Sequence, residues 1–96
     1  MKAELLVYGV FCRRVEYPAK SDGVKCVDLF TTAMCQKENR EKDQFVRAYT
    51  CLEAAQSAAN WSNAAAIERA LEGLKGATAG TSFCYYVSVI EVYGKE

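Results

Sequence analysis

Two segments of this 96-residue chain are apolar on both of their alternating faces, and this feature constrains the fold more than any other. The first covers residues 3–17 (AELLVYGVFCRRVEY) and the second covers residues 82–93 (SFCYYVSVIEVY). Both are rich in β-branched and aromatic residues, which is typical of strands whose two faces are dry. We therefore predict a strand at each end of the chain and expect the second to be central in its sheet.

The segment that follows the first strand is open to two interpretations. Residues 18–23 (PAKSDG) have turn chemistry and end in Asp-Gly, which favours a hairpin. Residues 24–36 (VKCVDLFTTAMCQ) are then predicted to be its second strand because of their Val and Thr content. The alternative is a helix, since Val27, Phe30 and Met34 also fit a helical stripe.

A run of charged residues and an alternating segment precede the middle of the chain. Residues 37–43 (KENREKD) are predicted to form a solvated turn. Residues 44–49 alternate, which predicts a short strand with Phe45, Arg47 and Tyr49 on one side. Thr50 and Glu53 form a capping box, so a helix is expected from residue 51. The alternative is a helix that already begins near residue 42.

Two short helices are predicted next. Residues 51–60 (CLEAAQSAAN) present a narrow face of small residues, and residues 60–63 (NWSN) are expected to interrupt the helix. Residues 64–75 (AAAIERALEGLK) have the spacing of an amphipathic helix, which Gly76 ends. The prediction is a single α+β domain over residues 1–96. It has an antiparallel sheet of three to four strands with both helices on one face, in the order β-β-β-α-α-β.

Two short helices are too small to cover strands that are apolar on both faces. Either another part of the chain or a second copy must cover the remaining face. The sequence therefore favours a homodimer that forms through the second sheet face.

Charge and cysteine content limit the classes of partner and compartment. Lys plus Arg and Asp plus Glu both number 12, so the chain lacks the basic excess typical of phosphate binding. The five cysteines have no C-x-x-C spacing, which indicates free thiols in a reducing, cytoplasmic environment. Glu4 interrupts the short apolar run at the N-terminus, so neither a signal peptide nor a membrane span is expected.

Catalytic motifs are not recognisable in the sequence. The chain has no histidine, which excludes a nucleophilic triad of the usual kind. Glu68 and Glu72 lie one helical turn apart on a face that is expected to be solvated. Gly73, Gly76 and Gly80 follow a helix, whereas a phosphate-binding loop precedes one. We therefore expect no enzyme, no cofactor and no metal site.

Five residues are the candidates for partner binding: Arg13, Arg14, Trp61, Tyr85 and Tyr86. The arginines are adjacent, so on a strand they point to opposite faces. The tyrosines can stack on bases or simply pack within a sheet. Trp61 is expected to cover the junction between two helices; if exposed, it would be an interface anchor.

The segment from Phe45 to Ala55 (FVRAYTCLEAA), a strand leading into a capped helix, resembles a plan found in short phage-encoded accessory proteins. Some proteins of that kind inhibit host CRISPR systems. The resemblance implies a small protein that blocks a surface of another macromolecule. The leading hypothesis is thus a non-enzymatic protein-binding module. The alternative is a nucleic-acid-binding protein that uses Arg13, Arg14 and the tyrosines.

Overall fold

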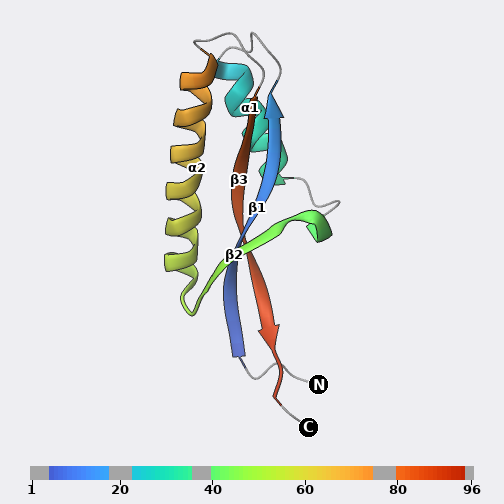
Figure 1. Ribbon diagram of the computed structural model, residues 1–96. Helices are drawn as coiled ribbons and strands as arrows, with labels where there is room; N and C mark the ends of the chain where they lie inside the picture. The colour runs from blue at the N-terminus through green and yellow to red at the C-terminus, as the bar shows by residue number, and fades with distance from the viewer. Residues whose placement is uncertain (1–4, 18–22, 36–39, 75–79, 95–96) are drawn as a thin grey trace.

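The computed structural model describes residues 5–17, 23–35, 40–74 and 80–94 of the chain. Three strands, two α-helices and one short 3₁₀ helix follow one another in the order β-α-β-α-β (Figure 1). The elements are β1 (Leu5–Tyr17), α1 (Gly23–Cys35), η1 (Arg40–Lys42), β2 (Gln44–Tyr49), α2 (Leu52–Leu74) and β3 (Gly80–Val92). The predicted α+β class and antiparallel sheet are confirmed, whereas the predicted order β-β-β-α-α-β is wrong.

The sheet has three antiparallel strands in the order β2-β1-β3. β1 and β3 pair along their whole lengths, from Leu5↔Val92 to Tyr17↔Gly80. The strands predicted at both ends of the chain and at residues 44–49 are confirmed. β1 is the central strand, so the prediction that the last strand is central is wrong. β3 is an edge strand whose apolar character matches its contact with α2.

α1 occupies the segment that was predicted to be a strand, so the helical alternative is the correct one. Phe30 of α1 is fully buried in a cluster with Val15 and Tyr17 of β1. The Thr31 Oγ1 hydroxyl donates to the carbonyl of Val27 one turn earlier, at 3.0 Å, which satisfies a Thr side chain within a helix. The burial of Phe30 outweighs the modest β propensity of Val and Thr.

α2 is one continuous helix, and the break predicted at residues 60–63 is wrong. Its buried stripe consists of four alanines that are at most 2% exposed: Ala55, Ala59, Ala66 and Ala70. The polar residues 60–63 lie inside this helix. The Ala55 N–H donates to the Cys51 carbonyl at 3.1 Å, so Cys51 is the N-cap residue, one position after the predicted Thr50.

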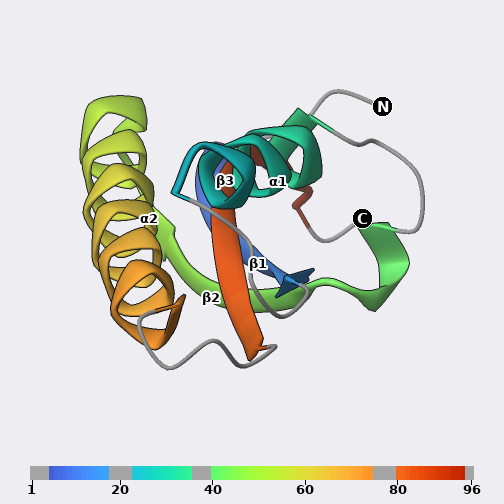
Figure 2. The ribbon, with the colours of Figure 1, turned by 90° about the horizontal axis from the view of Figure 1, so that it is seen from above.

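The prediction that both helices lie on one face of the sheet is wrong. Ala55 and Ala59 pack against Val10, whereas Ala66 and Ala70 belong to the cluster of Val15. Val10 and Val15 point to opposite faces because side chains alternate along a strand. α2 therefore runs along the outer edge of β3 and contacts both faces, while α1 covers one face (Figure 2).

A β-bulge in β2 changes which side chains share a face. β1 pairs Val10 with Arg47 but Phe11 with Phe45, so Val46 has no partner in the ladder. Phe45 therefore lies on the face opposite to Arg47, and the predicted common face of Phe45, Arg47 and Tyr49 is wrong. A bulge of this kind inserts one residue and twists the edge strand.

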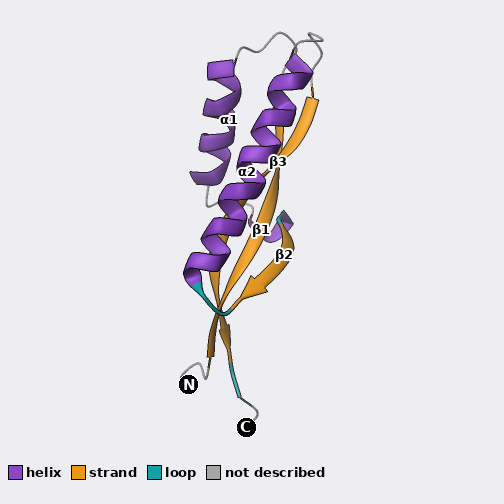
Figure 3. Ribbon diagram, turned by 90° about the vertical axis from the view of Figure 1, so that its left-hand side faces the viewer, coloured by secondary structure: helices purple, strands orange, loops and turns teal. Residues whose placement is uncertain are grey.

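The ends of β1 and β3 near the chain termini form a ribbon, defined here as residues 5–9 paired with residues 88–92; Tyr8 and Gly9 also pair with β2, so only residues 5–7 and 90–92 are two-stranded. Figures 1 and 3 show the end of this ribbon projecting past the first turn of α2 and past β2. The molecule measures 56 × 24 × 16 Å and has a radius of gyration of 15.7 Å. A compact chain of this length would have about 13 Å. The ribbon thus makes the fold elongated.

Candidate functional site

A buried ion pair joins β1 to the start of β2. The Arg13 Nε donates to both carboxylate oxygens of Asp43, at 3.1 and 3.2 Å, and Nη2 lies 3.0 Å from Oδ2. Arg13 Nη1 donates to the carbonyl of Ala33 in α1 at 3.1 Å. The side chains of Arg13 and Asp43 are only 10% and 4% exposed. One guanidinium therefore holds three segments together: β1, α1 and the entry to β2.

Tyr86 extends this network along the same face of the sheet. Its hydroxyl donates to Asp43 Oδ2 at 2.7 Å, and its ring stacks on Phe11 with centroids 5.7 Å apart. The Arg40 guanidinium lies 4.6 Å from the centroid of the Tyr86 ring. Phe45 contacts Phe11 edge-on at 5.7 Å. The result is an aromatic cluster on the α1 side of the sheet, next to the buried ion pair.

The electrostatics of the network shift two pKa values in opposite directions. Burial by itself would raise the pKa of Asp43, but hydrogen bonds from Arg13 and Tyr86 and the nearby positive charges outweigh it. The pKa of Asp43 therefore lies below its ordinary value, and the carboxylate stays ionised. Burial and the hydrogen bond to Asp43 raise the pKa of Tyr86 to about 12. The neutral phenol is thus the form that the fold stabilises.

The stability contributed by Tyr86 is expected to be lost at alkaline pH. Its pKa rises from about 10 in the unfolded chain to about 12 in the fold, so its contribution is complete below pH 10. The contribution then declines as pH rises through 12, because the phenolate would face Asp43. Urea unfolding of the native protein and of Tyr86→Phe should show a stability difference that narrows between pH 9 and pH 12. A difference that stays constant over this range would contradict the assignment.

Of the five candidate partner-binding residues, the structure brings Arg13 and Tyr86 together, with the Arg13 guanidinium 6.0 Å from the Tyr86 ring centroid, and places the other three elsewhere. Arg13 is buried in the ion pair, whereas Arg14 points to the other face and forms an exposed pair with Glu16 at 3.1 Å. Tyr86 belongs to the network, and Tyr85 packs against both core clusters. Trp61 is 79% exposed on α2, so it covers no junction between helices, contrary to the expectation. These residues do not form one site.

Asn63 of α2 forms hydrogen bonds with backbone groups on the outer edge of β3, the edge that does not pair with β1. Its Oδ1 accepts from the Tyr85 N–H at 2.6 Å, and its Nδ2 donates to the Tyr85 carbonyl at 2.8 Å. Nδ2 also lies 3.3 Å from the Met34 sulfur of α1. A side-chain amide thus takes the place of a neighbouring strand. The same asparagine explains why a polar residue is tolerated between the alanines of the buried stripe.

Half of the twelve exposed large hydrophobic side chains in the described segments lie on the ribbon and the adjoining part of β2. Six large side chains there are 40–56% exposed, and we call them the ribbon surface: Leu5, Leu6, Phe45, Val46, Val89 and Val92. On the α1 side the pairs Leu5↔Val92 and Val7↔Ile90 lead up to the aromatic cluster. Exposed patches of this kind mark interaction sites more often than isolated exposed side chains do.

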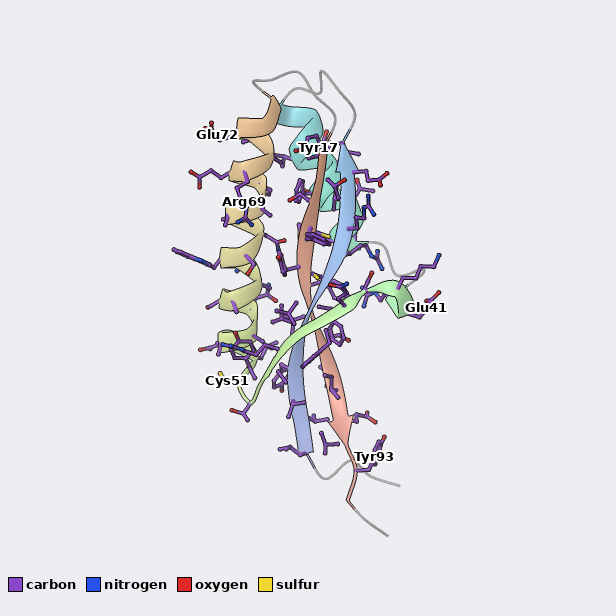
Figure 4. All side chains as sticks on the ribbon, viewed as in Figure 1. Tyr17, Glu41, Cys51, Arg69, Glu72 and Tyr93 are labelled. Atoms are coloured by element: carbon purple, nitrogen blue, oxygen red, sulfur yellow. The ribbon has the colours of Figure 1, made fainter. Side chains whose placement is uncertain are left out.

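Gly9 lies between the ribbon and the aromatic cluster, where the absence of a side chain leaves room for Ile90 and Phe11. A Cβ added at Gly9 would lie 2.7 Å from Ile90 Cδ1 and 2.9 Å from Phe11 Cε2. These two side chains therefore close over the glycine backbone and join the ribbon to the aromatic cluster. Glu91 is the one charged residue among the ten of the ribbon, and its carboxylate accepts from the Tyr93 hydroxyl. Figure 4 shows Tyr93 at the end of the molecule opposite to Tyr17 and Glu72.

Cys12, Cys35, Cys51 and Cys84 are free thiols. Cys12 and Cys84 are buried, and burial raises the pKa of both, whereas Cys35 and Cys51 are exposed. Within residues 5–17, 23–35, 40–74 and 80–94, no group of three or more Cys, Asp or Glu side chains is placed to hold a metal ion. No helix in the described part of the chain is long and apolar enough to cross a membrane.

No protein-family model, curated protein or solved structure matches this chain. The resemblance of residues 45–55 to phage-encoded accessory proteins therefore stays a prediction.

Several residues that build this region were not singled out by the sequence. Asp43 was assigned to a solvated turn; η1 and the exposed Glu41 and Lys42 fit that assignment, but the Asp43 side chain is buried. The sequence did indicate a buried acidic residue, because Arg13 lies in a strand with two dry faces and a buried charge requires a partner. Asn63 had a comparable signal, because it stands in register with the small residues of α2.

Proposed function

We propose that this chain is a non-enzymatic protein-binding module and that its binding surface is the ribbon surface. One observation carries the proposal: apolar side chains on both faces of the ribbon, Leu5 and Val92 on one face and Leu6 and Val89 on the other, are 40–53% exposed. A two-stranded ribbon is only marginally stable by itself in water. A partner that buries the ribbon would remove apolar area from water and support both strands.

The chemistry of the ribbon surface favours a protein over a nucleic acid. Phosphate binding needs exposed basic groups. Arg13 is buried and paired with Asp43, and Arg14 lies on the opposite face beside Glu16. The ribbon itself carries only the negative charge of Glu91. The partner is therefore expected to present an uncharged apolar surface, and the module would act by blocking that surface.

The test is affinity capture from a lysate of the organism that makes the chain, with and without nuclease. The informative variant is Leu5→Lys combined with Val92→Glu. These positions pair directly across the two strands, so the new charges can form a cross-strand ion pair worth about 0.2–1 kcal/mol and keep the ribbon folded. The native chain is expected to recover a protein in both arms, and the double variant is expected to recover less than about a tenth as much.

Leu71→Lys is the matched control, because Leu71 is also a partly exposed apolar residue but lies near the far end of α2. It should recover as much partner as the native chain. If the double variant captured as much partner as the native chain, the ribbon surface would not be the binding surface. Recovery of nucleic acid alone, lost on nuclease treatment, would favour the nucleic-acid alternative.

A further inference from the structure

We infer that the outer edge of β3 along the ribbon binds an extended segment of the partner protein as an added antiparallel strand, with a basic residue of that segment opposite Glu91. The inference rests on the proposed function, because it names the form in which a partner binds the ribbon. It refines the uncharged surface expected of that partner by one basic residue. Three observations support it: the open backbone groups of this edge, the apolar side chains beside them and the charge of Glu91.

The hydrogen bonds of Asn63 show which backbone groups of β3 point away from β1. Asn63 bonds both the N–H and the C=O of Tyr85, so both groups of that residue face outward. In a strand, the backbone groups of every second residue point the same way. The pairing of β3 with β1 continues without a break in register to Val92. Val89 and Glu91 therefore also direct their N–H and C=O groups outward.

The outward groups of Val89 and Glu91 have no partner among the residues that the structure describes. α2 passes the edge at Tyr85, but the end of the ribbon lies beyond the first turn of that helix (Figure 1). The side chain of Val89 is 53% exposed, so α2 does not cover this part of β3. An edge with unpaired N–H and C=O groups is a template for another strand. An extended main chain, which offers a donor and an acceptor at every second residue, is therefore the ligand that this edge fits.

The other free edges of the sheet suit an added strand less well. β2 is short and contains the bulge at Val46, which twists an edge away from a straight partner. β1 pairs with β2 from Tyr8 onward, so in the described part of β1 only residues 5–7 lack a neighbour on that side. Of these three, only Leu6 directs its backbone groups away from β3, because it stands opposite Glu91. The outer edge of β3 therefore provides the longer run of open groups beside the ribbon.

Glu91 favours a basic residue on the added strand and disfavours a second copy of β3. No Lys or Arg of the described segments forms an ion pair with Glu91. Opposite charges that face each other across two strands stabilise their pairing, and like charges weaken it. β3 contains no Lys or Arg, so β3 of a second copy could not place a positive charge opposite Glu91. Val89 and Ile90 lie on opposite faces and favour β-branched residues at the two neighbouring positions of the added strand.

A designed peptide tests the inference on the whole chain. The probe is acetyl-Thr-Lys-Val-Val-Thr-amide, which in antiparallel register places its Lys opposite Glu91 and its second Val opposite Val89. In NMR spectra of the isotope-labelled protein, it should shift the amide signals of Val89 and Glu91 with a Kd of about 1 mM or below. Replacing the Lys with Glu should raise the Kd roughly 5-fold. A backbone N-methyl group on the second Val removes the N–H that would bond the Val89 carbonyl, and should raise the Kd at least about 10-fold.

Val89→Pro removes the same kind of bond from the side of the protein. Proline is tolerated where the N–H of an edge strand faces solvent, so the circular dichroism spectrum should stay unchanged. Val89→Ala is the matched control, because it also shortens the side chain but keeps the N–H. The Kd of the peptide should rise at least about 10-fold in Val89→Pro and at most about 3-fold in Val89→Ala. If Val89→Pro does not fold, the N-methylated peptide makes the same comparison on the native chain.

Three results would overturn the inference. The peptide could shift neither amide signal up to about 5 mM, or the N-methylated peptide could bind as tightly as the unmodified one. Light scattering could show a dimer of the native chain that Val89→Pro abolishes, because a second copy would then occupy the edge. Capture of a protein that is equal in Val89→Pro and Val89→Ala but lost in Leu5→Lys with Val92→Glu would overturn this inference and leave the proposed function standing. A native chain that captures nothing would remove both.

Discussion

Replacing Asp43 with asparagine is expected to lower the free energy of unfolding by about 3–5 kcal/mol at neutral pH. The change removes the carboxylate that bonds the guanidinium of Arg13, which is buried at 10% side-chain exposure. The Asn amide group would also turn its donors toward those of Arg13. Since small domains have a total stability of about 5–15 kcal/mol, this loss would unfold a substantial fraction of the protein. Urea unfolding followed by circular dichroism measures it.

Glu16→Gln is the control for the effect of Asp43→Asn. It breaks an ion pair between the same residue types, but the side chains of Arg14 and Glu16 are 65% and 71% exposed. Exposed pairs of this kind contribute about 0–1 kcal/mol because water solvates both charges. A loss in Asp43→Asn as small as that in Glu16→Gln would show that burial does not strengthen the dependence on Asp43.

Replacing Asn63 with alanine is expected to cost about 2 kcal/mol. The change removes both hydrogen bonds to the backbone of Tyr85, at 2.6 and 2.8 Å, and leaves an N–H and a C=O without their partner. Each unsatisfied group costs about 1–3 kcal/mol, and the better helix propensity of alanine recovers up to about 0.7 kcal/mol. Urea unfolding measures the loss, and hydrogen exchange should be faster at the Tyr85 amide.

Asn60→Ala makes the same substitution one turn earlier in the same helix. The Asn60 side chain accepts a hydrogen bond from Gln56 at 3.0 Å on the exposed surface of α2. Such a pair contributes only about 0.2–0.5 kcal/mol, so the gain in helix propensity should leave this variant about as stable as the native protein. If Asn63→Ala were also as stable as the native protein, water would have to bond the Tyr85 N–H and C=O in place of Asn63.

The proposed binding surface was only partly predictable from the sequence. Tyr86 and Arg13 were named, and the excess of apolar strand surface over helix cover was recognised. The position of that surface was not, because it depends on where the helices stop along the strands. α1 covers one face around Val15 and α2 reaches both faces from the edge, so the uncovered part is the ribbon. Phe45 lies on the α1 side of the sheet only because of the bulge at Val46.

The sequence by itself determined the three strands, since apolar character on alternating positions is a local property of β1, β2 and β3. It also placed the change from β2 to α2 within one residue, because a capping motif is local too. Tertiary structure decided the rest. Residues 24–35 are helical because Phe30 is buried against β1, and residues 60–63 stay helical because Asn63 bonds the edge of β3. Arg13 and Asp43, 30 residues apart, meet only in the fold, where burial makes each require the other.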